Sequence, residues 1–142
     1  MMITIEQLIG IVKDASKLMV ADGFEIEQKG GYEKIVTTSD LAVQNYLYEK
    51  LSAIMPQSGF LCEEKDINDS QHEYTWIIDP IDGTANYSRG IDQCAICVGL
   101  KHGNEMVMGV VYVPRTFELF HAEKGKGAYL NGKRIEVSGR EF

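Results

Sequence analysis

The sequence predicts an α+β fold in which two N-terminal helices pack on a mostly antiparallel sheet. Two stretches near the N-terminus repeat apolar residues at intervals of three and four, the spacing of one helix face. From residue 74 onward, runs rich in β-branched and aromatic residues alternate with turns that contain Gly or Asn. The 142 residues suit one ordinary domain, and no linker or repeat divides them, so we expect residues 1–142 to form a single domain.

The first helix is predicted over residues 4–22, with Thr4 and Gln7 spaced as a capping box and Gly23 ending it. The polar residues 28–34 contain a Gly-Gly pair and are expected to form a loop. The second helix is predicted over residues 39–55. For this helix, Ser39 is expected to be the N-cap, and Pro56 the residue that stops it.

The rest of the chain is predicted to be mainly strands. One helical turn is expected within residues 83–89, and a tight connection at residues 102–105. Strands are expected over residues 58–62, 74–79, 94–101, 106–113 and 117–122, followed by a hairpin over residues 129–135 with Asn131-Gly132 at its turn.

Composition excludes several classes of function. The chain has 14 Lys+Arg against 21 Asp+Glu, and this net charge of −7 argues against binding to nucleic acid or to anionic membranes. No apolar run approaches the ~20 residues of a membrane span.

Three cysteines suggest free thiols in a reducing compartment, so we expect a cytoplasmic protein. Cys94 and Cys97 stand three apart on a strand and should point to opposite faces, which favours core packing over a metal or redox pair.

The most informative segment begins where the strand over residues 74–79 ends. Asp79 closes that strand, Pro80 fixes the direction in which the chain leaves it, and Asp82 returns a second carboxylate. Gly83 and Thr84 would then open a short helix whose free backbone amides can bind a phosphate. Two carboxylates beside such amides suit Mg²⁺, which bridges protein and phosphoryl oxygens.

A plain turn is the alternative interpretation, because Asp, Pro and Gly are common turn residues. The unbroken string between a strand and a helix favours a site. A second acidic pair, Glu63-Glu64, also follows a strand and could complete a metal cluster with Asp79, although paired acids more often lie on a solvated surface.

Residues 76–86 closely resemble the first signature of the inositol monophosphatase family. Residues 36–40, 60–64, 109–112 and 124–128 also resemble family segments in the same order, with Cys62 where the family has Gly. The resemblance implies the N-terminal half of the layered sugar-phosphatase fold. It also implies direct hydrolysis of a phosphomonoester by a water molecule, which is activated by Mg²⁺ ions held in the site.

The resemblance further implies a role for each matching residue. Glu63, Asp79, Asp82 and the Ile81 carbonyl would hold Mg²⁺, and Asp79 would bridge two ions. The Gly83 and Thr84 amides would bind the substrate phosphate. Asp40 and the Thr84 hydroxyl, together with Glu63, would be the catalytic groups that position and activate the attacking water. Glu64 would support this shell, and Lys29 would reach an outer metal-bound water.

Inositol 1-phosphate is the expected substrate, because Asn86-Tyr87 resembles the inositol branch of the family. The alternatives are a 3′-phosphonucleotide, a sugar bisphosphate or the phosphate of NADP, or a non-catalytic module that binds only the metal. Titration of Mg²⁺ against activity would separate the phosphatases from the module, and a panel of substrates would separate the phosphatases from one another.

The sequence also departs from the family. Family members are roughly twice as long, and their second half carries a Trp-Asp-x-Ala signature whose Asp is the last ligand of the second metal. Trp76 is the only Trp here, so that signature is missing. We therefore expect a truncated form that lacks the C-terminal domain and has weak or no activity. Partners are expected to be a small phosphorylated substrate and, as is common in the family, a second copy in a homodimer. A sheet face left uncovered would favour such association.

Overall fold

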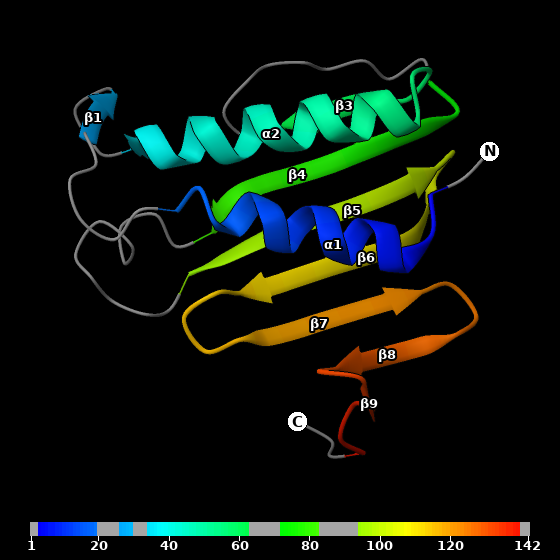
Figure 1. Cartoon of the computed structure of the whole chain (residues 1–142). Helices are drawn as coiled ribbons and strands as arrows, with labels where there is room; N and C mark the ends of the chain where they lie inside the picture. The colour runs from blue at the N-terminus through cyan, green and yellow to red at the C-terminus, as the bar shows by residue number, and fades with distance from the viewer. Residues whose placement is uncertain (1–2, 20–25, 30–33, 63–71, 83–93, 140–142) are drawn as a thin grey trace.

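The computed structural model describes residues 3–19, 26–29, 34–62, 72–82 and 94–139. Helices α1 (Ile5–Ser16) and α2 (Thr38–Ile54) lie on one face of a seven-stranded sheet, as Figure 1 shows. Two short strands, β1 (Ile26–Lys29) and β2 (Lys34–Thr37), form a separate antiparallel pair. This arrangement confirms the predicted α+β class.

The large sheet follows the order of the chain. Its strands, in spatial order, are β3 (Gly59–Cys62), β4 (Tyr74–Asp82), β5 (Ala95–His102), β6 (Glu105–Val113), β7 (Glu118–Glu123), β8 (Gly127–Leu130) and β9 (Lys133–Ile135). Only β3 and β4 are parallel, and every other neighbouring pair is antiparallel. The predicted Asn-Gly turn joins β8 to β9, with φ of 50° at Asn131 and 80° at Gly132, as a two-residue hairpin loop requires.

Helix α1 begins as predicted but ends earlier. The Thr4 amide donates to the Gln7 side chain at 2.9 Å, and the Gln7 amide donates to the Thr4 hydroxyl at 3.1 Å, which confirms the capping box. The prediction that the helix reaches residue 22 is wrong, because it ends at Ser16. The Ser16 hydroxyl donates to the Lys13 carbonyl at 2.5 Å. In the turn that follows, the Leu18 amide donates to the Ala15 carbonyl. A side chain that competes for backbone carbonyls weakens helix continuation.

Two further boundaries differ from the prediction. Thr38 is already helical, so Ser39 lies inside α2 and is not its N-cap. Strands β1 and β2 occupy parts of the predicted loop over residues 28–34, because pairing with each other supplies the hydrogen bonds of both segments. Residues 30–33, and the helical turn expected within residues 83–89, lie outside the described residues.

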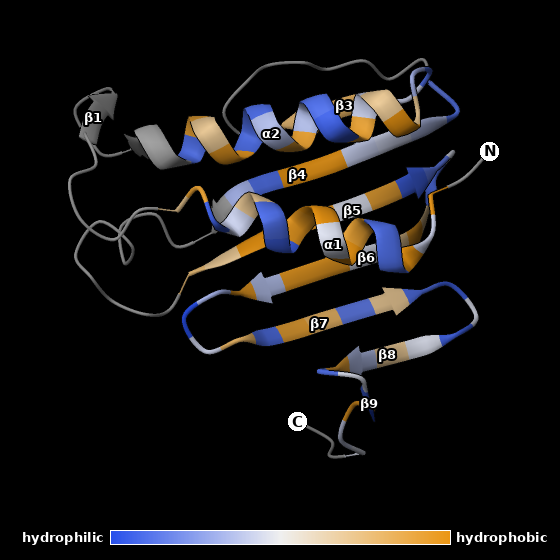
Figure 2. Cartoon of the chain, in the orientation of Figure 1, coloured by the Kyte–Doolittle hydropathy of each residue, from blue (hydrophilic) through white to orange (hydrophobic). Residues whose placement is uncertain are grey.

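The core lies between the two helices and the sheet. Helix residues Leu8 and Leu47 and strand residues Trp76 and Ile96 are fully buried there. Figure 2 shows apolar stripes along both helices and the central strands. Burial alternates along β5, so the side chains toward the helices are buried and those on the other face are partly exposed. No helix within the described ranges is both long and apolar enough to cross a bilayer.

Candidate functional site

The predicted acidic motif lies at the C-terminal end of β4. This strand continues to Asp82, so the prediction that it ends at Asp79 is wrong. Asp79 pairs with Cys97 of β5 and Asp82 pairs with Ala95, so three steps along β4 match two along β5. The extra residue makes a β-bulge, and Pro80 lies within it. A bulge tolerates proline because a residue there need not donate a hydrogen bond to the neighbouring strand.

The bulge changes which positions share a face. In a regular strand, positions 79 and 82 would lie on opposite sides of the sheet, because side chains alternate. Their partners Cys97 and Ala95 are two residues apart on β5 and therefore share one side. The bulge thus places positions 79 and 82 on the same side of the sheet, at the end of the strand.

A third acidic residue lies at this end of the molecule, on the helix layer. Asp40 is in the first turn of α2 and only 1% exposed. A carboxylate is favoured there because the free amides of a helix N-terminus carry partial positive charge. Figure 1 shows the start of α2 and the end of β4 at the same end of the fold. The structure therefore gathers two elements that carry predicted site residues.

The structure covers the other predicted site residues only in part. Strand β3 is parallel to β4 and ends at Cys62, which pairs with Ile78, one residue before Asp79. Lys29 pairs with Lys34 between β1 and β2. For Lys29, Ile81 and Asp82 the structure describes the backbone position alone. The predictions for Glu63, Glu64, Gly83 and Thr84 fall outside the described residues, so all of these roles stay predictions.

The donor chemistry of the described site suits a hard cation. Asp79 is half-buried, and one of its carboxylate oxygens is fully buried. Carboxylate and carbonyl oxygens are the ligands that Mg²⁺ prefers. Within the described ranges, no three His, Cys, Asp or Glu residues gather into a metal-binding group. Cys94 is buried and Cys97 is half-buried, and neither forms a disulfide.

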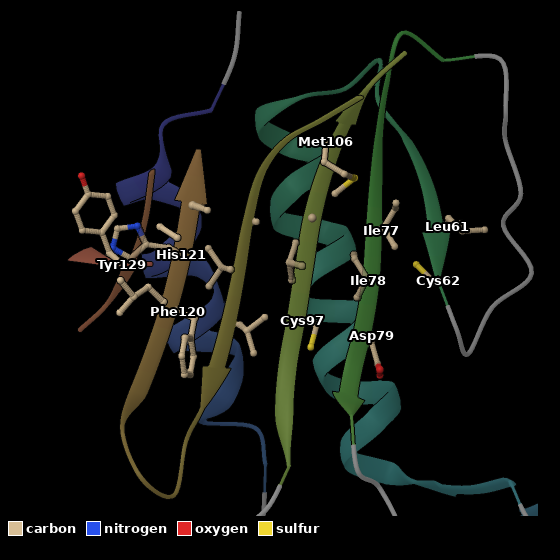
Figure 3. Close-up of a pocket in the computed structure, with 18 residues that line it drawn as sticks. Leu61, Cys62, Ile77, Ile78, Asp79, Cys97, Met106, Phe120, His121 and Tyr129 are labelled. Atoms are coloured by element: carbon tan, nitrogen blue, oxygen red, sulfur yellow. The ribbon is translucent and has the colours of Figure 1, made fainter. Parts of the chain in front are cut away.

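Sequence reasoning missed a hollow on the face of the sheet that the helices leave uncovered. Figure 3 views it with both helices behind the strands, and its volume is about 690 Å³. Asp79 is among its lining residues, so the hollow reaches the acidic end of β4. The signal was present in the sequence, because Gly99, Gly109, Ala122 and Ala128 recur in neighbouring strands. Only the register aligns these small residues into one row.

Comparison with known proteins gives consistent matches over nearly all of the chain. The model of the inositol monophosphatase family matches residues 3–141. Inositol monophosphatase 1 of Solanum lycopersicum is 36% identical over 96% of this chain and 54% of its own length. A solved structure of a Thermotoga maritima IMPase superposes with a TM-score of 0.88 at 30% identity, covering 95% of this chain and 54% of its own.

A second solved structure contains bound ligands. It is an IMPase/NADP phosphatase complexed with Mg²⁺ and phosphate, with a TM-score of 0.82 and 26% identity, covering 93% of this chain and 51% of its own. In each of these comparisons the chain spans about half the length of the protein it matches.

Proposed function

Because the chain belongs to the inositol monophosphatase family, we propose that it forms the metal- and phosphate-binding half of a Mg²⁺-dependent phosphatase. The reaction is hydrolysis of a small phosphate monoester, with inositol 1-phosphate as the first candidate substrate. The relative from Solanum lycopersicum is named as an inositol monophosphatase, which supports this choice of substrate.

The observation that supports this function best is the bulge at the end of β4. It places acidic positions 79 and 82 on one side of the sheet, where the parallel strand β3 also ends. Glu63 is the residue that follows β3 in the sequence. Three carboxylates supplied from two parallel strand ends are a reasonable ligand set for Mg²⁺.

In this proposal the chain holds the metal and orients the reactants. Glu63, Asp79, Asp82 and the Ile81 carbonyl hold Mg²⁺, with Glu64 and Lys29 supporting them. When bound, Mg²⁺ neutralises phosphoryl charge and makes water more acidic. The Gly83 and Thr84 amides would bind the phosphate, as free backbone amides can. Asp40 and the Thr84 hydroxyl would together orient the attacking water.

In this proposal the 142 residues supply only part of the metal site. The relatives carry about as much polypeptide again outside the match, and the predicted last metal ligand belongs to a signature that the chain lacks. We therefore propose that the 142 residues bind Mg²⁺ and phosphate but release phosphate slowly or not at all.

The test is Mg²⁺-dependent phosphate release from inositol 1-phosphate by the purified chain. Asp79→Asn removes one proposed ligand, and Asp14→Asn makes the same chemical change on the exposed face of α1. Release that needs Mg²⁺ and vanishes only in Asp79→Asn supports a working site in the chain. If a folded chain shows neither release nor Mg²⁺-dependent stabilisation, the proposed function is wrong.

One alternative substrate has support from a specific comparison, because the phosphatase complexed with Mg²⁺ and phosphate is also named as an NADP phosphatase. A panel containing inositol 1-phosphate, NADP, a 3′-phosphonucleotide and a sugar bisphosphate separates these candidates. A chain that Mg²⁺ stabilises but that turns over none of them would instead be a metal-binding module.

A further inference from the structure

The turn between β6 and β7 ends on a residue that does not suit its backbone. Phe117 has a φ of 58°, in the left-handed region where a side chain crowds the following carbonyl oxygen. Every other residue with a positive φ in the described ranges is a glycine or an asparagine, namely Gly103, Gly125, Gly127, Asn131 and Gly132. A bulky aromatic residue therefore stands where Gly or Asn would cause less strain.

Packing does not explain why a phenylalanine stands at this position. Phe117 is 73% exposed, which makes it the most exposed aromatic side chain in the part of the chain that the structure describes. The turn is closed through the backbone, by the pairing of Val113 with Glu118. A residue that strains the backbone and fills no core points to a role in binding, because strained residues gather at sites that contact ligands.

The register places Phe117 at the same end of the sheet as the acidic positions of β4. Ile96, Tyr112 and Leu119 pair in one row across β5, β6 and β7. Asp82 pairs with the residue one step beyond this row on β5, and Phe117 comes two steps beyond it, just before β7. Figure 1 shows the β6–β7 connection at the same end of the fold as the tip of β4 and the start of α2. Three strand spacings, or about 14 Å, separate the end of β4 from the start of β7.

The same turn also carries a cation. Arg115 is exposed and precedes Phe117 by two residues. A guanidinium group binds phosphate oxygens, and an exposed aromatic ring stacks on a planar base. A nucleotide that carries two or more phosphates contains partners for both side chains. Inositol 1-phosphate has no second phosphate and no planar ring, and its single six-membered ring is too short to bridge the distance from β4 to β7.

We propose that Phe117 and Arg115 form a second subsite, which binds the nucleotide part of a substrate whose phosphate monoester lies at the acidic end of β4. The ring of Phe117 stacks on a base, and Arg115 binds a phosphate other than the one that is hydrolysed. Both residues determine specificity and take no part in the hydrolysis itself. This inference rests on the proposed phosphatase function, and it names nucleotides as the substrate class that the chain prefers over inositol 1-phosphate.

The experiment measures binding to the purified 142-residue chain by isothermal titration calorimetry in the presence of Mg²⁺. The ligands are NADP, a 3′-phosphonucleotide, inositol 1-phosphate and inorganic phosphate. Phe117→Gly removes the ring, whereas Phe117→Tyr keeps it. Arg115→Gln removes the cation, and the matched control Arg134→Gln makes the same chemical change at an exposed position of β9. Circular dichroism confirms that each variant folds.

We expect the wild-type chain to bind at least one of the two nucleotides more tightly than inositol 1-phosphate. Phe117→Gly should reduce this preference about tenfold, which is the contribution of one base stacked on an aromatic ring. Arg115→Gln should also reduce it, and this loss should shrink in 1 M NaCl because salt screens the attraction between Arg115 and a phosphate. Phe117→Tyr and Arg134→Gln should retain the preference. The nucleotide that shows these losses is the one that fits the subsite.

Urea unfolding separates a role in binding from a role in the fold. We expect Phe117→Gly to unfold at a higher urea concentration than wild type, because Gly adopts a positive φ without crowding. A lower midpoint would show that the ring supports the fold, and the proposal would be wrong. An undiminished nucleotide preference in Phe117→Gly would overturn it as well.

Failure of this inference is distinguishable from failure of the proposed function. If the folded wild-type chain binds none of the four ligands, inorganic phosphate included, the proposed phosphatase function is wrong and the subsite with it. If the chain binds inorganic phosphate and inositol 1-phosphate but prefers neither nucleotide, the subsite alone is refuted.

Discussion

Asp79 stands directly opposite Cys97 across β4 and β5, immediately before the bulge that contains Pro80. This pairing puts the Asp79 carboxylate on the side of the sheet away from α1 and α2, where it lines the hollow. Asp79 thus belongs both to the proposed metal site and to the hollow on the uncovered face of the sheet.

Replacing Asp79 should abolish stabilisation by Mg²⁺. A ligand that binds only the folded chain stabilises it by about 2.7 kcal/mol at a concentration of 100 times Kd. For a domain of this size, that gain raises Tm by several degrees. We expect this increase in wild type and in Asp14→Asn, but not in Asp79→Asn, when melting is followed by circular dichroism with and without Mg²⁺. An equal increase in Asp79→Asn would remove Asp79 from the ligand set.

Replacing Asp40 should show how much its side chain stabilises the fold. Asp40→Ala removes a carboxylate that is 1% exposed and lies in the first turn of α2, and losing the polar interactions of such a buried group costs about 1–3 kcal/mol of unfolding free energy. Asp40→Asn keeps the shape and should cost less. Urea unfolding, followed by the fluorescence of Trp76, the only Trp and fully buried, measures both. If Asp40→Ala were as stable as wild type, the carboxylate would have no structural role at the start of α2.

The sequence predicted the helices and the long strands because their apolar periodicity is strong. It failed where long-range pairing decides the outcome. Strands β1 and β2 are polar and short, and only their mutual pairing makes them strands. The extension of β4 through Pro80 was missed because a proline normally ends a strand, and the bulge that accommodates it depends on the register with β5.

The candidate site was predicted through a local motif and a family resemblance, and the structure describes only some of its residues. The start of α2, which carries Asp40, and the end of β4, which carries Asp79, lie at one end of the fold, and the roles of both residues stay predictions. The hollow could not be predicted in the same way, because the small residues that line it, Gly99, Gly109, Ala122 and Ala128, come from four different strands. Single glycines and alanines in strands show no pattern until the register is known.

Removing the capping box of α1 should destabilise the whole domain. Thr4→Ala leaves the Gln7 amide without its 3.1 Å hydrogen bond, and loss of such a cap costs about 1 kcal/mol. The matched control is Thr116→Ala, because Thr116 is exposed and its hydroxyl donates to the side chain of the half-buried Glu118. We expect the midpoint of urea unfolding to fall in Thr4→Ala and to stay within error in the control. A similar fall in both variants would mean that the cap is not responsible.

The pair between Glu105 and Lys124 should make stability depend on pH in a defined direction. The hydrogen bond and positive charge of Lys124 lower the pKa of Glu105, with a smaller contribution from His102. A carboxylate whose pKa is lower in the folded state than in the unfolded state stabilises the folded state at pH values above the pKa of the unfolded state. This stabilisation is lost as pH falls through the lowered value. Wild type should therefore be slightly more stable than Glu105→Gln near neutral pH.

That difference should shrink toward zero as pH falls through the lowered pKa of Glu105, where its carboxylate takes up a proton. It should also shrink in 1 M NaCl, because both side chains are exposed and salt screens their attraction. Urea unfolding of wild type, Glu105→Gln and the control Glu136→Gln, at neutral pH and at a series of falling acidic pH values, measures it, since Glu136 is an exposed glutamate on the same chain. If the difference grew at low pH, the carboxylate of Glu105 would be stabilising the unfolded state instead.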